Sequence, residues 1–596
     1  MDCLKEDAIA SHKLWKATGK PRSGDIFNKY HAAKLLYKKR IRECQQDETS
    51  SYTNDLHDAL IKKQGNEFWK TWRSKFDSKS TRKLQVDGLT DDSEIVTNFE
   101  CYFTKTCTNL TEDGSKRLTE KYNNVRENYC GLPFDEELLF NVELIDKSVK
   151  SLGLGKAAGL DGLTAEHLQS SHPVLFTLLN KLFNLMIKHG YVPDSFGASY
   201  TVPLPKCNYT TVSKSLTVED FRGISISPVL SKVFEKCILD RYQRFFETSD
   251  HQFGFKKGIG CSHAIFTVKC VVDHFVKQGS TVNLCALDLR KAFDKMNHHG
   301  LFINLMERML PINLLCTLEY WFSISSTCVR WGDYYSNFIK LRCGVRQGGI
   351  LSPYFFAIYI DGIVRIFQNN DIGCKIGLVS VNIFLYADDI VLLAPSVDAL
   401  QKMVTLCEQY LGSLDMALNA KKSMCMRFGP RFNSECCELT TLSGESLAWV
   451  GNCRYLGVYL VAARQFTCSV SNNKKSFYRS FNAIYGKVGR CASEEVVIKL
   501  ICTKCLPVLI YGLEACPVKL SVKQSLDFVV NRAFMKVFKT SSIDIVNECQ
   551  VMFNFKKVSD IIMQRKRSFI QRYINCENII CQFFRDMARI ELMLLR

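Results

Sequence analysis

The sequence predicts an α+β fold, and three features carry that prediction. Residues 381–385 and 390–394 are short apolar runs separated by a polar pair, which is typical of a β-hairpin. A third β-type run covers residues 282–287. After residue 352, apolar side chains repeat at helical spacing, which indicates a helix with one buried face. We therefore expect an antiparallel sheet backed by helices, with carboxylates where its strands end.

Two adjacent carboxylates, Asp388 and Asp389, occupy the tip of the predicted hairpin. For this dipeptide alone, ordinary turn chemistry is the more frequent explanation. A third carboxylate, Asp288, follows the run at 282–287, and strand ends place polar side chains on an open rim. Neighbouring like charges are costly unless a cation or solvent compensates them. The pattern therefore predicts a pair of Mg²⁺ ions, which prefer oxygen ligands and keep substrate phosphates in their coordination shells.

Such a site suits phosphoryl transfer. One ion activates the attacking oxygen and the other stabilises the leaving oxygen, at a separation of about 3.5–4 Å. The three carboxylates therefore indicate nucleotidyl transfer.

The segments around these carboxylates resemble reverse transcriptase motifs in both order and spacing. Motifs A to E correspond to residues 286–294, 344–353, 386–389, 418–423 and 455–458, and the fingers motifs to residues 202–206, 221–225 and 230–235. Their spelling is similar to that of non-LTR (LINE-type) retrotransposons. The resemblance implies a right-hand polymerase fold, with fingers, a palm built on an antiparallel sheet, and a helical thumb.

The resemblance extends beyond these motifs. Residues 155–163 resemble an N-terminal fingers motif shared by LINE-type and group II intron enzymes, and residues 506–514 resemble a LINE-type thumb segment. Residues 30–42 and 68–72 are similar to the stretch that joins endonuclease to reverse transcriptase in full-length elements. We expect three segments: a basic helical N-terminal extension or linker at 1–133, fingers and palm at 134–464, and a helical thumb with a C-terminal extension at 465–596.

The resemblance also implies roles for individual residues. The metal ligands would be Asp288, Leu289, Asp388 and Asp389, holding two Mg²⁺ ions, with Mn²⁺ as an alternative. Lys422 would assist the leaving pyrophosphate as a general acid beside the three catalytic aspartates. The nucleotide-binding residues would be Lys206, Arg222, Phe293, Gln347 and Gly348. Phe293 corresponds to the steric gate that rejects a ribose 2′-hydroxyl. The structural residues of the motifs are Tyr386, Ala387, Gly349, Ser352, Pro353, Leu456 and Gly457.

Several of these assignments compete with structural explanations. A ring at Phe293 is also plausible as core packing, and Lys422 as a surface lysine after a turn. For Arg346, a structural salt bridge is as plausible as a nucleic-acid contact. Gly348 and Gly349 permit close approach or positive φ. Beyond them, Ser352 is expected as an N-cap with Pro353 in the first helical turn.

Composition agrees with a nucleic-acid partner. A chain of 596 residues exceeds what one hydrophobic core usually supports. Its formal net charge of +18 and pI near 8.9 favour a polyanion. Basic clusters occur at Lys34, Lys38, Lys39, Arg40 and Arg42, and at Arg565, Lys566, Arg567 and Arg572. Each cluster alone is more typical of a solvated face.

Other sequence features bear on location and metal content. The polar N-terminus lacks the apolar core of a signal peptide, and no run approaches the roughly 18 apolar residues that cross a bilayer. The 27 cysteines are expected to be reduced. Cys502 and Cys505 have zinc-ligand spacing but lack a second pair, since Cys491 and Cys516 are not so spaced.

Together these observations predict an RNA-directed DNA polymerase that uses an RNA template, a DNA primer or target, and deoxynucleoside triphosphates. We expect an intracellular ribonucleoprotein of nucleus and cytoplasm, without a membrane partner. The alternatives are a transposon-derived RNA-binding protein without polymerase activity and a splicing helper like those of group II introns.

The chain also begins inside a linker-like stretch, so we expect a longer reading frame that has been cut. The part before the fingers is too short for a nuclease of ordinary domain size. We expect primer extension without nicking of supercoiled plasmid, which a plasmid relaxation assay measures.

Overall fold

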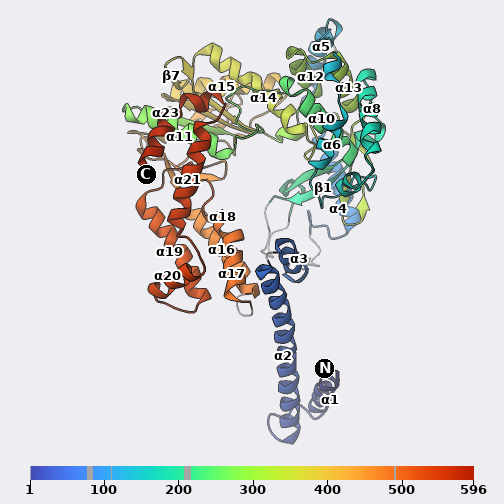
Figure 1. Cartoon of the computed structure of the whole chain (residues 1–596), viewed down its shortest axis with the longest axis vertical. Helices are drawn as coiled ribbons and strands as arrows, with labels where there is room; N and C mark the ends of the chain where they lie inside the picture. Colours follow the sequence, from blue (N-terminus) through green and yellow to red (C-terminus); the bar gives the residue numbers. More distant parts are fainter. Residues whose placement is uncertain are drawn as a thin grey trace. The chain divides into compact units, whose positions relative to one another are not determined.

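The computed structural model describes residues 2–62, 64–76, 85–108, 111–133, 135–206, 216–488 and 492–595. These residues form two compact units (Figure 1). The large unit contains residues 82–468, 515–517 and 567–596, and the small unit contains residues 1–81, 469–514 and 518–566. The expected boundary at residue 134 falls on a residue outside the described ranges.

A six-stranded sheet forms the centre of the large unit. Its strand order is β12-β13-β11-β3-β10-β9. The strands are β3 (Val282–Leu287), β9 (Ile383–Tyr386), β10 (Asp389–Ala394), β11 (Met424–Phe428), β12 (Leu439–Thr440) and β13 (Ser446–Trp449). Strand β3 pairs antiparallel with both β10 and β11, and β9 and β10 form a hairpin. The predicted hairpin is therefore confirmed, and so is antiparallel pairing for β9, β10, β3 and β11. Strands β11 and β13 pair in parallel, so the six-stranded sheet as a whole is mixed.

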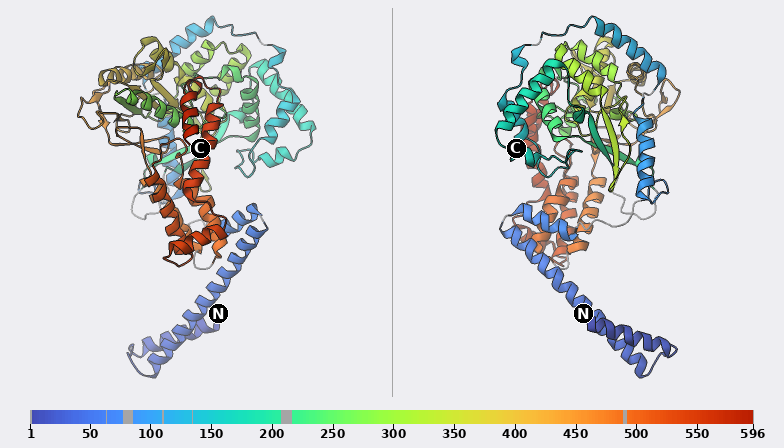
Figure 2. Two further views of the ribbon diagram at one scale, coloured as in Figure 1. Left: turned by 60° about the vertical axis from the view of Figure 1, so that its left-hand side comes forward. Right: turned by 90° about the vertical axis from the view of Figure 1, so that its right-hand side faces the viewer.

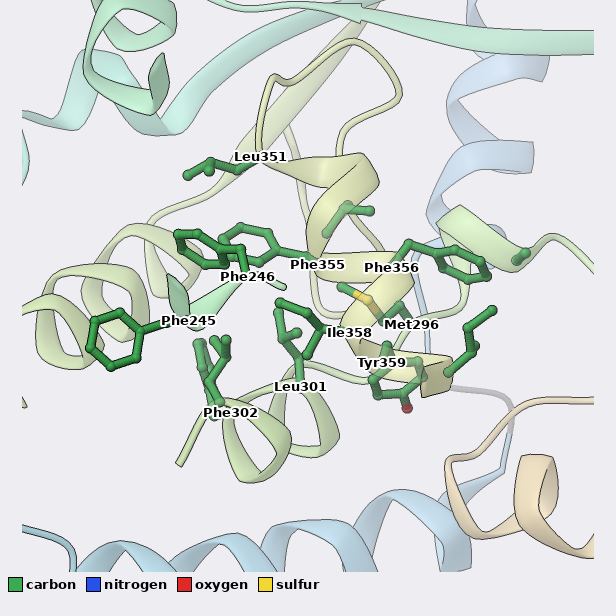
Figure 3. Packing of buried hydrophobic residues seen from close by; sticks show 14 of the residues in the cluster. Phe245, Phe246, Met296, Leu301, Phe302, Leu351, Phe355, Phe356, Ile358 and Tyr359 are labelled. Atoms are coloured by element: carbon green, nitrogen blue, oxygen red, sulfur yellow. The ribbon is translucent and has the colours of Figure 1, made fainter. Parts of the chain in front are cut away.

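Helices cover both faces of this sheet, which is why its strands are apolar on both sides. Successive residues of β3, such as Leu284 and Cys285, point to opposite faces and belong to different hydrophobic clusters. On one face lies α15 (Val397–Ser413), which packs against α14 (Ser352–Asn370). On the other lies α11 (Cys261–Lys277). The predicted helical stripe after residue 352 is core: Phe355, Phe356 and Tyr359 of α14 meet Met296, Leu301 and Phe302 (Figure 3).

A second sheet lies beside this core and has the order β2-β1-β4-β5, with β6 paired to β4. Its strands are β1 (Ala198–Pro205), β2 (Phe221–Ile226), β4 (Ser326–Trp331), β5 (Tyr334–Tyr335) and β6 (Ile339–Lys340). Strand β1 runs antiparallel to β2 and parallel to β4. Helix α4 (Asp92–Thr106) packs on β4, and its Phe99 contacts Phe221 and Trp331. Residues ahead of the expected fingers segment thus share a core with this sheet.

The large unit contains further helices, turns and short strands. The helices and turns are α5 (Glu112–Glu127), η1 (Glu136–Leu138), α6 (Val142–Lys150), α7 (Ala165–Gln169), α8 (Val174–His189), α9 (Asp194–Gly197), η2 (Val218–Asp220), α10 (Val229–Arg241), η3 (Gln243–Phe245), η4 (Ala292–Asp294), α12 (His298–Glu307), α13 (Ile312–Ser323), α22 (Ile579–Phe583) and α23 (Arg585–Leu594). The remaining strands are β7 (Lys375–Ile376), β8 (Val379–Ser380), β14 (Asn452–Tyr455), β15 (Val458–Val461) and β16 (Thr467–Ser469).

The small unit is helical. Its elements are α1 (Asp2–Ala17), α2 (Asp25–Ile61), α3 (Gly65–Phe76), α16 (Ser471–Val488), α17 (Glu494–Leu500), the π-helix η5 (Ile501–Cys505), α18 (Leu506–Leu509), α19 (Leu520–Val537) and α20 (Ile543–Met552). Helix α21 (Val558–Ile574) begins here and ends in the large unit. Helix α1 lies alongside α2 (Figure 2), where Trp15 stacks on Tyr30 at 4.7 Å. Leu56, Phe68 and Trp72 share a core with α16 to α21.

The expected basic clusters are largely exposed. On α2, Lys34, Lys38, Lys39 and Arg40 are exposed, whereas the side chain of Arg42 lies outside the described residues. On α21, Lys566 is buried, and Arg565, Arg567 and Arg572 are exposed. Among the helices that the structure describes, none is both long and apolar enough to cross a membrane.

Candidate active site

The hairpin of β9 and β10 turns through Ala387 and Asp388. Asp389 pairs with Tyr386, so Ala387 and Asp388 alone form the turn. Ala387 has φ of +55°, a positive value that a two-residue hairpin turn requires at its first position. Alanine tolerates this conformation poorly, so the surroundings must hold the turn in place.

The sheet register brings the third carboxylate to the same place. Leu287 of β3 lies opposite Ile390 of β10, and the next residues toward the open end are Asp288 and Asp389. Asn419 donates its side-chain amide to Asp288 Oδ2 at 3.0 Å, and the backbone N–H of Asp288 donates to Ser423 Oγ at 3.1 Å. The segment predicted as motif D therefore holds Asp288 from the side.

The three carboxylates interact electrostatically. Burial, together with the charges of Asp388 and Asp288, raises the pKa of Asp389 to about 6, and the Arg454 guanidinium opposes this rise. Burial and the charge of Asp288 also raise the pKa of Asp388, while Arg222 and Lys422 oppose it. These groups destabilise one another's charged forms, so a bound cation would be favoured here.

The donor set suits a hard cation because it offers only carboxylate oxygens. Within the described part of the chain, however, no three aspartate, glutamate, histidine or cysteine side chains meet in metal-binding geometry. The carboxylates are thus electrostatic neighbours rather than a closed cage. This agrees with the coordination preference of Mg²⁺, which binds one or two carboxylates and completes its coordination shell with water and substrate phosphates.

Two cations, Arg222 and Lys422, interact electrostatically with Asp388, and Lys206 lies next to these two cations. Lys422 Nζ lies 3.8 Å from Asp288 Oδ2, and its side chain is 69% exposed. Burial lowers the pKa of Lys206, and the charges of Lys422 and Arg222 lower it further. Lys206 Nζ donates to the carbonyl of Glu219. The structure therefore brings together Lys206, Arg222 and Lys422, which come from three separate motifs.

The motif B turn lies against β2. Gln347 accepts a hydrogen bond from the backbone N–H of Ser225 through its carbonyl at 2.8 Å, and its side-chain amide donates to Asp294 Oδ1 at 2.9 Å. Gly348 has φ of +135°, and a Cβ there would collide with the carbonyl of Ser225. Phe293, beside Asp294, is half-buried and stacks on Phe356 at 4.7 Å. Phe293 is thus packed on one side and accessible on another, so the gate and core explanations both stand.

Arg346 has a structural role, but its contacts are hydrogen bonds to neutral groups and not the salt bridge considered from the sequence. Its guanidinium donates to the carbonyl of Phe196 at 2.9 Å, to Ser325 Oγ at 3.0 Å and to the carbonyl of Gly197. Burial lowers its pKa to about 10 despite the nearby charge of Glu235. The contacts are with two carbonyls and a hydroxyl, so Arg346 is occupied inside the protein rather than facing nucleic acid.

The expected N-cap at Ser352 was wrong by one residue. Ser352 is the first residue of α14, and Leu351 caps it without a side-chain hydrogen bond. The buried carboxylate of Glu235 lies directly before the helix, where the backbone N–H groups of Ile350 and Leu351 both donate to it. The expectation for Pro353 is confirmed, since it lies in the first helical turn.

Several residues around the site were missed from the sequence. Lys291 Nζ donates to Thr106 Oγ1 at 3.2 Å and lies 4.4 Å from the ring of Tyr102, so α4 reaches the segment that follows Asp288. Arg454 faces Asp389 from the strand before the turn at Leu456 and Gly457, both of which have positive φ. These contacts join distant residues, so no local pattern in one sequence predicts them.

Comparison with known proteins agrees with this geometry. Residues 205–460 match the family model described as reverse transcriptase (RNA-dependent DNA polymerase). The Pol polyprotein of the type-2 retrotransposable element R2DM of Drosophila melanogaster is 27% identical over 333 residues, or 54% of this chain and 30% of that protein. The RNA-directed DNA polymerase of the mobile element jockey of Drosophila funebris is 26% identical over 360 residues, 58% of this chain and 37% of that protein.

Residues 205–460 are therefore similar to reverse transcriptases, and these relatives belong to retrotransposable and mobile elements. The matched residues contain the expected motifs A to E and the motifs at 221–225 and 230–235, and the reverse transcriptase domain has the right-hand polymerase fold. The chain spans about a third of the length of these curated relatives. Apo telomerase from Candida tropicalis aligns with TM-score 0.33 and 12% identity, covering 70% of this chain and 73% of that one, a score too low to carry any argument.

Proposed function

We propose that this chain is an RNA-directed DNA polymerase that extends a DNA primer on an RNA template. The observation that carries the proposal is the meeting of Asp288, Asp388 and Asp389 at one end of the sheet, with Arg222 and Lys422 beside Asp388 and Lys206 next to these two cations. Carboxylates for cations and cations for phosphates are the two halves of a nucleotidyl transfer site. The formal net charge of +18 suits a long polyanionic substrate.

The reaction assigns a role to each part of the site. The primer 3′-hydroxyl attacks the α-phosphate of a deoxynucleoside triphosphate, a P–O bond forms, and pyrophosphate leaves. Asp288, Leu289, Asp388 and Asp389 would hold two Mg²⁺ or Mn²⁺ ions, which would activate the attacking oxygen and stabilise the leaving one. Asn419, through its hydrogen bond to Asp288 Oδ2, orients that carboxylate.

The remaining residues bind and select the nucleotide. Lys206 and Arg222 hold the triphosphate, for which guanidinium and ammonium donors are suited. Lys422 gives a proton to the departing pyrophosphate; its side chain is largely exposed beside Asp288. Phe293 lies under the sugar, and Gln347 and Gly348 border the templating base pair. The hydrogen bond from Gln347 to Asp294 restricts the orientation of the Gln347 side chain.

For the domains, we propose fingers and palm at residues 134–464, a thumb at residues 465–596 and a basic extension at residues 1–133. Helix α4 supports a contribution of the extension to the fingers, since it shares a core with β2 and β4. We further propose that the protein works as an intracellular ribonucleoprotein in nucleus and cytoplasm.

Primer extension on an RNA template separates this proposal from a protein that only binds RNA. Purified protein with Mg²⁺, an annealed DNA primer and deoxynucleoside triphosphates should give template-directed extension that chelation of the metal stops. Tight RNA binding without extension would instead favour the transposon-derived RNA-binding protein.

Arg222 offers a test of triphosphate binding. Arg222→Gln removes one charge-assisted contact, worth about 1.5–3 kcal/mol, so we expect the KM for the incoming nucleotide to rise roughly ten- to a hundredfold. Steady-state single-nucleotide incorporation measures this change. Arg365→Gln, at an exposed arginine of α14, is the control and should leave the KM near the wild-type value. Equal KM values in the two variants would contradict the role given to Arg222.

A further inference from the structure

A short segment ahead of α11 lies directly beside the hairpin strand β9. Residues 251–253 run parallel to β9, with Gln252 bridged to Leu385. The backbone N–H of Phe253 donates to the carbonyl of Leu385 at 2.8 Å, and the N–H of Leu385 donates to the carbonyl of His251 at 2.9 Å. The segment therefore extends the edge of the sheet immediately before the catalytic turn.

The side chain of Gln252 reaches the turn itself. Its Oε1 accepts hydrogen bonds from the backbone N–H of Ala387 at 3.2 Å and from that of Gly254 at 2.9 Å. Ala387 lies in the turn, outside the paired strand residues, so its N–H needs an acceptor from elsewhere. Gln252 is fully buried and supplies that acceptor.

Gly254 makes this approach possible. A Cβ on Gly254 would lie 2.6 Å from Ala387 N, which is shorter than real Cβ contacts, and 3.0 Å from Gln252 Oε1, which is tighter than most of them. The glycine is thus required by space and not by its backbone conformation. Any side chain at residue 254 would push the turn away from Gln252.

Ordinary core packing does not account for Gln252. Its Nε2 is buried and has no hydrogen-bond partner within the described residues, and an unpaired buried donor costs about 1–3 kcal/mol. A methionine or leucine would fill the same space without that cost. Compared with an apolar side chain, the amide of Gln252 adds two hydrogen bonds to its Oε1. One of them comes from the turn that carries Asp388.

We propose that Gln252 and Gly254 are positioning residues for the catalytic turn. Gln252 Oε1 anchors the N–H of Ala387 and so holds the positive φ of that residue, which sets the direction of the Asp388 side chain. Gly254 allows the anchor to come close enough. Neither residue touches the substrate. This inference rests on the proposed function of Asp388, but it concerns how the turn is held and not which reaction occurs there.

Two substitutions at Gln252 separate anchoring from packing. Gln252→Met keeps the length and apolar bulk but removes the acceptor, and displacement of a catalytic group by about 1 Å can lower a rate about a hundredfold. We expect Gln252→Met to lower kcat about ten- to a hundredfold without changing the Kd for primer and template. Gln252→Glu keeps an oxygen at the Oε1 position and is expected to be neutral when buried, so it should recover kcat to within a few-fold of wild type.

Mn²⁺ binding gives a readout that does not depend on turnover. Electron paramagnetic resonance titration of the protein with Mn²⁺ alone should show weaker binding in Gln252→Met than in wild type, and binding close to wild type in Gln252→Glu. Gly254→Ala should behave like Gln252→Met. Gly260→Ala is its control, since Gly260 has an extended backbone and open space where a Cβ would stand.

The outcomes are distinct. Wild-type kcat and Mn²⁺ affinity in Gln252→Met, or equal losses in Gln252→Met and Gln252→Glu, would overturn the positioning role. A wild-type protein that fails to extend any primer would instead remove the proposed function. The Mn²⁺ comparison would still test in that case whether the turn depends on Gln252.

Discussion

Replacing Asp388 with asparagine should abolish most Mg²⁺-dependent nucleotide incorporation and leave the fold intact. The change is nearly isosteric but removes one charge from a half-buried group beside Asp288. Loss of one preorganised electrostatic contact typically costs a hundred- to a thousandfold in rate, and we expect at least that for Asp388→Asn. Asp288→Asn should be as severe, and Asp389→Asn the mildest of the three. Single-turnover incorporation into an annealed primer measures each effect.

A surface aspartate provides the matched control for these variants. Asp398, in the first turn of α15, pairs with Lys402 at 2.8 Å and is largely exposed. Surface ion pairs contribute little, so Asp398→Asn should keep both activity and melting temperature. Near wild-type incorporation by cleanly purified Asp388→Asn would falsify the assignment of the catalytic carboxylates.

Replacing Phe293 with valine should change which sugar the enzyme accepts. A ring against the 2′-carbon rejects ribose by overlap, and overpacking typically costs about 1–3 kcal/mol. That energy corresponds to roughly ten- to more than a hundredfold discrimination. In Phe293→Val, ribonucleotide incorporation should rise relative to deoxynucleotide incorporation, with unchanged Mg²⁺ dependence. Incorporation efficiencies for a matched ribo- and deoxyribonucleotide pair give the ratio.

The stacking of Phe293 on Phe356 makes a stability control necessary. Aromatic pairs contribute about 0.5–1.5 kcal/mol beyond their buried area, so Phe293→Val should also lower the melting temperature somewhat. Phe293→Tyr keeps the ring and should keep the wild-type sugar ratio. If the ring is only core packing, Phe293→Val will lose activity toward both sugars in parallel and the ratio will not move.

Arg346 shows how far a motif alone can inform a residue's role. Its place beside Gln347 made a nucleic-acid contact and a structural role equally plausible. The structure places its guanidinium among the carbonyls of Phe196 and Gly197 and the hydroxyl of Ser325. Phe196 and Gly197 lie on α9, and Ser325 lies just after α13. The role of Arg346 therefore depends on contacts between segments far apart in the sequence, which no local pattern encodes.

The N-terminal part of the chain gives a second example. Helix α4 was expected only within a basic extension, yet its Phe99 and Phe103 pack beside β2, and Thr106 contacts Lys291 next to the candidate site. The hydrophobic pattern of an amphipathic helix indicates that one of its faces is buried. This pattern does not indicate which sheet the buried face packs against.

The sequence by itself determined the local features of this protein. Apolar runs around a polar pair predicted the β9–β10 hairpin, and the motif spelling placed Asp288, Asp388 and Asp389 at strand ends. Such features depend on residues close together in the chain, so the hydrophobic pattern and turn residues of a single sequence are enough to predict them. The tertiary structure alone decided which distant groups meet. The register of β3 against β10 put Asp288 beside Asp389, and residues 251–254 came to lie under the turn. Those contacts are set by how whole surfaces pack, because burial rewards the total fit of many side chains and assigns no partner to any single residue in advance.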